Sequence, residues 1–127
     1  MIDKEKEVFT AVATRLRGKY PKIYVVGTEL TSTPPNFPAV SIVQTDNAIK
    51  TGHSTFDSFE NVVKEEYKAE VYSNLEKGKE AETKSITSDI SDIFRELGYV
   101  RTFCEPIANG DPTISRRISR YVKNNVI

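Results

Sequence analysis

One stretch of this chain alternates more regularly than any other, and it constrains the fold most. Between residues 62 and 75, apolar side chains fall on one face of an extended strand and charged side chains fall on the other. The apolar positions are Val63, Tyr67, Ala69 and Val71, and the charged ones are Lys64, Glu66, Lys68 and Glu70. A strand with one buried and one solvated face is typical of an antiparallel sheet. Glu65 interrupts the apolar face, so we expect it near the edge of the sheet.

The remaining pattern predicts two helices and four further strands. Helices are indicated by apolar stripes at three- and four-residue spacing over 3–17 and 76–97, followed by Gly18 and Gly98. Strands are predicted over 23–26, 39–45, 99–105 and 113–123. The order is α-β-β-β-α-β-β. We therefore expect a single α+β domain over 1–127, with one mostly antiparallel sheet of four or five strands and both helices packed on one face.

Two segments are predicted to be loops. Residues 31–38 hold three prolines and no periodic pattern, and residues 46–60 are polar and contain Gly52. Because long exposed loops often carry binding residues, the second segment is the predicted partner-contact loop, and 31–38 is a further candidate. Its candidate contact residues are Asn47, Lys50, His53 and Phe56.

Composition narrows the classes of function. Lys plus Arg and Asp plus Glu both number 18, so the chain lacks the basic excess of most phosphate-binding proteins. Its first residues are mostly charged, which predicts no signal peptide. No apolar stretch approaches the roughly 20 residues that a membrane span needs, so no membrane partner is expected.

Few residues could support catalysis or bind a metal. His53 is the single histidine and Cys104 the single cysteine, so neither a disulfide within the chain nor a cysteine-based zinc site is expected. Asp89 and Asp92 share a helix at i, i+3 and leave open a hydrolase that uses two carboxylates. Their serine neighbours favour an ordinary solvated face. We therefore predict no enzyme, no cofactor and no bound metal.

Charge is distributed unevenly along the neutral chain. Residues 57–82 hold eight acidic residues and four lysines, a net charge of −4, whereas residues 113–123 hold four basic residues and no acid. Random surface charge is one interpretation. A second is that acidic and basic surfaces of neighbouring copies meet head to tail, which closes a ring when the rotation permits. The candidate interface residues are Arg116, Arg117, Arg120, Tyr121, Glu66 and Glu70. A third is that the basic 113–123 strand contacts DNA phosphates.

Several segments resemble small tail proteins of long-tailed phages and Gram-positive prophages. The similar segments are Met1–Val12 followed by Tyr20-Pro21, Phe37–Val43 followed by Asp46-Asn47, Tyr67–Asn74, and Thr113–Arg117 followed by Arg120-Tyr121. These proteins are known as minor capsid or tail-completion proteins. The predicted element order is also similar to that of tail terminator proteins.

The resemblance implies a structural protein of the virion. A tail terminator forms a hexameric ring at the head-proximal end of the tail tube, stops tube polymerisation and offers a docking surface to the head connector. The implied partners are further copies of the chain, the tail tube protein and the head–tail connector protein, with non-specific contact to passing DNA. The implied location is the head–tail junction, after assembly in the cytoplasm of the host bacterium. A head-completion or neck protein is the alternative within the same class.

Overall fold

The computed structural model describes residues 5–30, 34–49, 62–108 and 110–126, with side chains described for most of them. It contains two helices and five strands in the predicted order. The helices are α1 (Glu5–Lys19) and α2 (Lys79–Glu96). The strands are β1 (Tyr24–Val26), β2 (Ala39–Ile49), β3 (Val62–Ser73), β4 (Val100–Ile107) and β5 (Ser115–Val126). The predicted α+β class is confirmed. Within the described ranges, no helix is long and apolar enough to cross a membrane.

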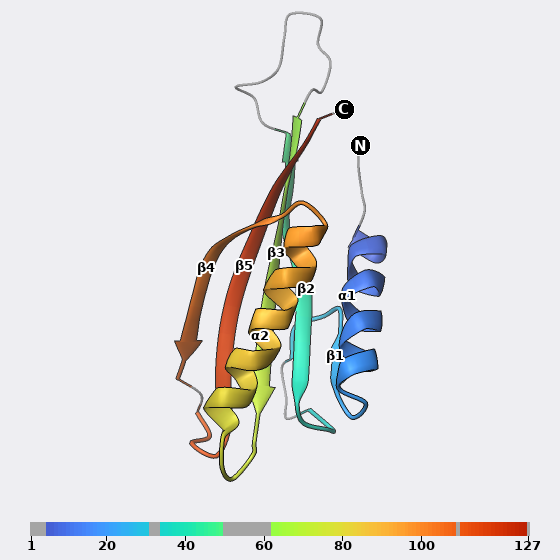
Figure 1. Ribbon diagram of the computed structural model, residues 1–127. Helices are drawn as coiled ribbons and strands as arrows, with labels where there is room; N and C mark the ends of the chain where they lie inside the picture. Colours follow the sequence, from blue (N-terminus) through green and yellow to red (C-terminus); the bar gives the residue numbers. More distant parts are fainter. Residues whose placement is uncertain (1–4, 31–33, 50–61, 109, 127) are drawn as a thin grey trace, which may run out of the picture.

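The five strands form one sheet in the order β1-β2-β3-β5-β4. The short strand β1 runs parallel to β2, and every other neighbouring pair is antiparallel. Both helices lie on one face of this sheet, and the upper ends of β2, β3 and β5 extend past the helices (Figure 1). The sheet is therefore covered by helices on one face and along only part of its length.

The core lies between the helices and the sheet. The expected stripe of α2 is buried at Ile86, Ile90, Ile93 and Phe94, as is that of α1 at Val8, Val12 and Leu16. Four aromatic rings fill the space between α2 and the central strands. The rings of Phe94 and Tyr121 are stacked with centroids 4.3 Å apart, and Tyr67 and Tyr99 pack around them. Such ring contacts add to the free energy gained by burying the apolar area.

The two predicted helix stops differ in outcome. At the end of α2, Gly98 adopts φ +93°. The N–H of Gly98 donates to the carbonyl of Arg95, and the N–H of Tyr99 donates to that of Phe94. These are the two bonds of a Schellman motif, which favours glycine because the backbone is left-handed. The prediction for Gly18 is wrong: α1 continues to Lys19, since one glycine in a last turn costs only about 1 kcal/mol.

Strand β2 is longer than the sequence pattern predicts. It runs to Ile49, so residues 46–49 belong to a strand and not to the predicted 46–60 loop. Beyond a register shift between Gln44 and Asp46, each residue still pairs with one on β3, and Asn47 lies opposite Glu65. Backbone pairing with β3 extends the strand here, where apolar alternation gives no signal. Lys50, His53 and Phe56, the other predicted contact residues, lie outside the described residues.

Candidate functional site: the charged face of the sheet

The face of the sheet opposite the helices carries ion pairs between β3 and β5. Arg116 binds Glu70, with its Nη2 2.6 Å and its Nε 2.9 Å from the same carboxylate oxygen, Oε2. Arg120 Nη1 lies 3.1 Å from Glu66 Oε1. Both pairs are diagonal. Glu70, for example, lies directly opposite Ile118, which is two residues along β5 from Arg116. Diagonal neighbours in an antiparallel sheet are within reach of side chains as long as arginine.

Glu70 is the most enclosed charge on this face, with 2% of the residue exposed. Besides Arg116, its carboxylate accepts a 2.6 Å hydrogen bond from the Tyr72 hydroxyl and lies 3.2 Å from Lys68 Nζ. Burial alone would raise the pKa of Glu70, but the hydrogen bonds from Tyr72, Arg116 and Lys68 outweigh it and lower that pKa. Burial and the bond to Glu70 raise the pKa of Tyr72. The four side chains therefore form one satisfied network with Glu70 ionised.

Part of this enclosure comes from the segment that follows β1. Lys68 also pairs with Glu29, and the Ser41 hydroxyl donates a 2.7 Å hydrogen bond to the Thr28 carbonyl. Thr28 and Glu29 thus lie against the face of the sheet that has no helix. Their contacts explain why Ser41 and Glu70 are buried on that face.

The opposite charges expected to meet between copies meet within one chain. Arg116 and Arg120 are paired with Glu70 and Glu66 on the adjacent strand. The reason is strand order, since β5 lies beside β3 in the sheet even though α2 and β4 separate them in the sequence. These four residues therefore no longer give a reason to expect opposite charges of neighbouring copies to meet. The same pairs neutralise Arg116 and Arg120, two of the four basic residues in the strand that was the candidate for DNA phosphate binding.

Tyr121 and Arg117 lie on the other face of β5. Tyr121 is fully buried in the core, and its hydroxyl bonds Ser91 and Ser119, so its predicted role in a subunit interface is corrected. Arg117 is half-buried, with Nη1 4.0 Å from the sulfur of Cys104. Consecutive strand residues point to opposite faces, which separates Arg117 and Tyr121 from Arg116 and Arg120.

Glu65 is a carboxylate buried on the helix-covered face of β3. It was expected near a sheet edge, but β3 is the middle strand and Glu65 is fully buried. The Tyr99 hydroxyl donates a 2.7 Å hydrogen bond to Glu65 Oε2. Burial and that bond raise the pKa of Tyr99. Lys123 donates to the Leu97 carbonyl at 2.8 Å and lies 5.6 Å from the centre of the Tyr99 ring. In the sequence, the only sign of this network is that Glu65 is a charged residue on the otherwise apolar face of the strand.

The two helix carboxylates considered for hydrolysis both form ion pairs with basic side chains. Asp89 accepts hydrogen bonds from Lys19 Nζ and from the Tyr20 hydroxyl, which join α2 to the end of α1. Asp92 pairs with Arg95 at 3.0 Å on the same helix. Within the described part of the chain, no group of three or more His, Cys, Asp or Glu side chains could hold a metal ion.

Comparison with known proteins gives no further assignment. No protein-family model matches this chain, and no curated protein is similar enough in sequence to be a relative.

Proposed function

We propose that this protein is a tail terminator of a long-tailed phage or prophage, which forms a ring at the head-proximal end of the tail tube. The observation that carries the proposal is the fold. Its α-β-β-β-α-β-β order and single sheet agree with the order that the resemblance to tail proteins implies. That agreement adds to the four similar segments, which are spread over nearly the whole sequence.

The shape of the domain suits a structural role. Residues 46–49 of β2 pair with residues 63–66 of β3, in the part of the sheet that extends past the helices (Figure 1). The segment that joins these two strands includes three of the four predicted partner contacts. We infer that this extension meets the tail tube or the head connector, while the helix-covered part forms the body of the ring. The mechanism is steric: a closed ring on the last tube layer removes the surface to which the next layer would add.

The described contacts favour this role over binding of DNA by β5. Arg116 has a buried carboxylate partner, and Arg120 has a half-buried one. Phosphate binding would have to displace these carboxylates, which would give up charge-assisted hydrogen bonds already made.

The experiment is electron microscopy of phage particles assembled with and without this chain. Termination predicts tubes of uncontrolled length when the chain is absent. Tails of normal length that fail to join heads would instead identify a head-joining protein. Binding of the purified chain to isolated tail tubes or to portal-bearing heads separates the same two roles. Normal tails correctly joined to heads would refute the proposal.

A further inference from the structure

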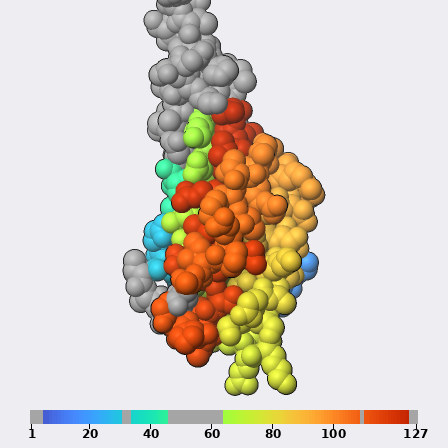
Figure 2. Space-filling model, turned by 90° about the vertical axis from the view of Figure 1, so that its left-hand side faces the viewer, coloured from blue at the N-terminus to red at the C-terminus, as the bar shows by residue number. Residues whose placement is uncertain are grey.

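Strand β4 is the least covered strand of the sheet. It forms one edge, and six of its eight residues are exposed, on both faces. Figure 2 looks onto this side of the molecule, where the orange atoms of β4 lie at the surface. Among the described residues, three large apolar side chains are exposed, and two of them are on β4: Val100 at 67% and Phe103 at 37%. Two exposed apolar side chains on one edge strand make this edge a candidate surface for contact with another molecule.

This edge is poorly suited to extending the sheet. The register to β5 shifts between Arg101 and Phe103, which marks a bulge, and Pro106 lacks a backbone N–H. Bulges and prolines are devices that keep edge strands from pairing with further strands. A partner at the β4 edge therefore contacts side chains and not the backbone. The opposite edge strand, β1, is also protected, because Arg17 Nη2 lies 3.4 Å from the Val25 carbonyl.

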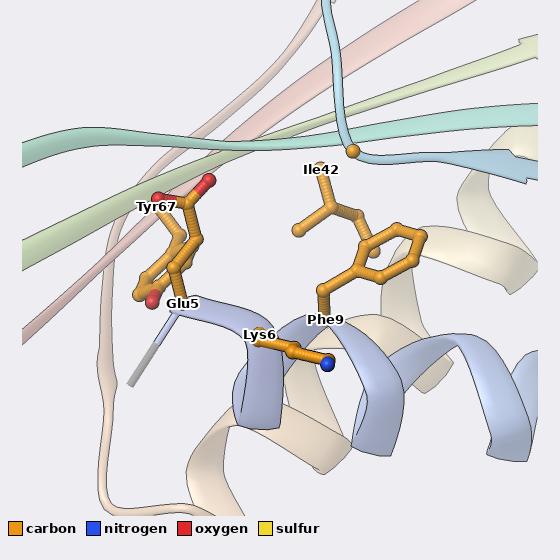
Figure 3. Close-up of a pocket in the computed structure, with 6 residues that line it drawn as sticks. Glu5, Lys6, Phe9, Ile42 and Tyr67 are labelled. Carbon is orange, nitrogen blue, oxygen red and sulfur yellow. The ribbon is translucent and has the colours of Figure 1, made fainter. Parts of the chain in front are cut away.

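The opposite side of the domain offers a matching surface. A hollow of about 400 Å³ opens between the first turns of α1 and the sheet, lined by Glu5, Lys6, Phe9, Gly27, Ile42 and Tyr67. In Figure 3, Phe9 and Ile42 face each other across it, and Lys6 lies beside Phe9. The lining is thus apolar around Phe9 and Ile42 and carries two charged side chains, Lys6 beside Phe9 and Glu5 towards Tyr67 (Figure 3).

The two surfaces agree in spacing and in charge. Phe103 and Glu105 pair with Arg120 and Ile118 of β5, so both lie on the face of β4 away from the helices. Residues i and i+2 of a strand are about 6.6 Å apart. Lys6 and Phe9 are three residues apart on a helix, a spacing that brings Cβ atoms to about 5–6 Å. Each surface therefore offers an apolar side chain and a charge at similar spacing. The charge beside Phe103 is the negative Glu105, and the charge beside Phe9 is the positive Lys6.

We propose that Phe103 of one copy packs against Phe9 in the hollow of the next copy, while Glu105 pairs with Lys6 at its rim. The two surfaces lie at opposite sides of the domain, at β4 and at α1 (Figure 1). A contact between two different surfaces is heterologous and generates a ring when the rotation closes. The inference rests on the proposed ring and names the surfaces that build it.

A charge swap tests this contact. Glu105→Lys and Lys6→Glu should each weaken association of the purified chain about tenfold or more, because each places like charges together. The double variant should restore association to near the wild-type level. Lys84→Glu, a reversal at an exposed position on α2, should leave association unchanged. Sedimentation velocity over a concentration series gives the association constants, and urea unfolding checks that every variant is folded.

The apolar half of the contact has its own variant. Phe103→Ala keeps all charges and should also weaken association, since it removes the ring that enters the hollow. Where the wild-type chain associates only on tube ends, the same variants are compared by the concentration that halves tube length.

Several results would overturn the inference. These are single reversals that associate like the wild type, a double variant as weak as the singles, or a two-fold symmetric dimer as the end state. Failure of the proposed function looks different. In that case the wild-type chain would form rings through these residues, yet tail length would not depend on it.

Discussion

The buried carboxylate of Glu70 gives the sharpest test of the charged face. Glu70→Gln keeps the shape of the side chain but removes the charge that Arg116, Lys68 and Tyr72 surround. Removing one member of a buried ion pair costs about 3–5 kcal/mol because the partner charge stays behind. The side chain of Arg116 is 28% exposed, so water recovers part of that cost. We therefore expect the lower end of the range, about 3 kcal/mol.

Glu66→Gln is the matched control. Glu66 pairs with Arg120 on the same face, but the two side chains are 19% and 38% exposed. A pair so accessible to solvent contributes about 1 kcal/mol or less. The two substitutions thus make the same chemical change in the same strand, against arginines of the same neighbouring strand, and differ in burial.

Urea unfolding at neutral pH measures both effects. The chain has six tyrosines and no tryptophan, so far-ultraviolet circular dichroism is the suitable signal. A loss of about 3 kcal/mol with an m-value of about 2 kcal/mol per molar lowers the midpoint by about 1.5 M. The control should lower it by about 0.5 M or less. Equal shifts for the two variants would refute the reasoning that burial decides the strength of these pairs.

Three further outcomes are expected. Because the folded pKa of Glu70 lies below its ordinary value of 4.5, its stabilisation is present above that pH and is lost as the pH falls through the folded pKa. The stability gap between wild type and Glu70→Gln should therefore shrink in acid, and a gap that stays constant in denaturant melts would contradict this. Tyr99→Phe removes the donor to buried Glu65 and should cost about 1–3 kcal/mol in thermal unfolding, and no loss would contradict the bond. Gly98→Ala should cost more than 1 kcal/mol, because φ is +93° and the added Cβ would lie 3.2 Å from Lys123; an unchanged midpoint would contradict the strain.

Local patterns predicted the elements but not their neighbours in the sheet. The stripe of α2 and the alternation of β3 each follow from a few residues close in sequence. The pairing of Glu70 with Arg116 joins residues 46 positions apart and depends on β5 inserting between β3 and β4. Nothing in the sequence of either strand specifies that order. The acidic residues of β3 and the arginines of β5 pair within the sheet, whereas the sequence pattern suggested two separate charged surfaces.

The alternation of side chains along β5 could have corrected the assignment of both Arg120 and Tyr121 to one interface. Arg120 and Tyr121 are consecutive in a strand, so they cannot lie on the same face. A half-exposed Arg120 therefore implies a core-facing Tyr121, as the structure has it. The extension of β2 to Ile49 had no such signal, because its polar residues are held by backbone pairing. The β4 edge and the hollow beside α1 also had none. The first depends on the order of the strands in the sheet, and the second depends on where α1 packs on it.

Tube assembly in the presence of the purified chain tests the central claim most directly. Tail tube protein is polymerised with increasing amounts of the chain, and tube lengths and ends are measured by electron microscopy. Termination predicts tubes that shorten as the chain is added and carry a ring at one end only. Tubes of unchanged length without a ring at either end would contradict the account.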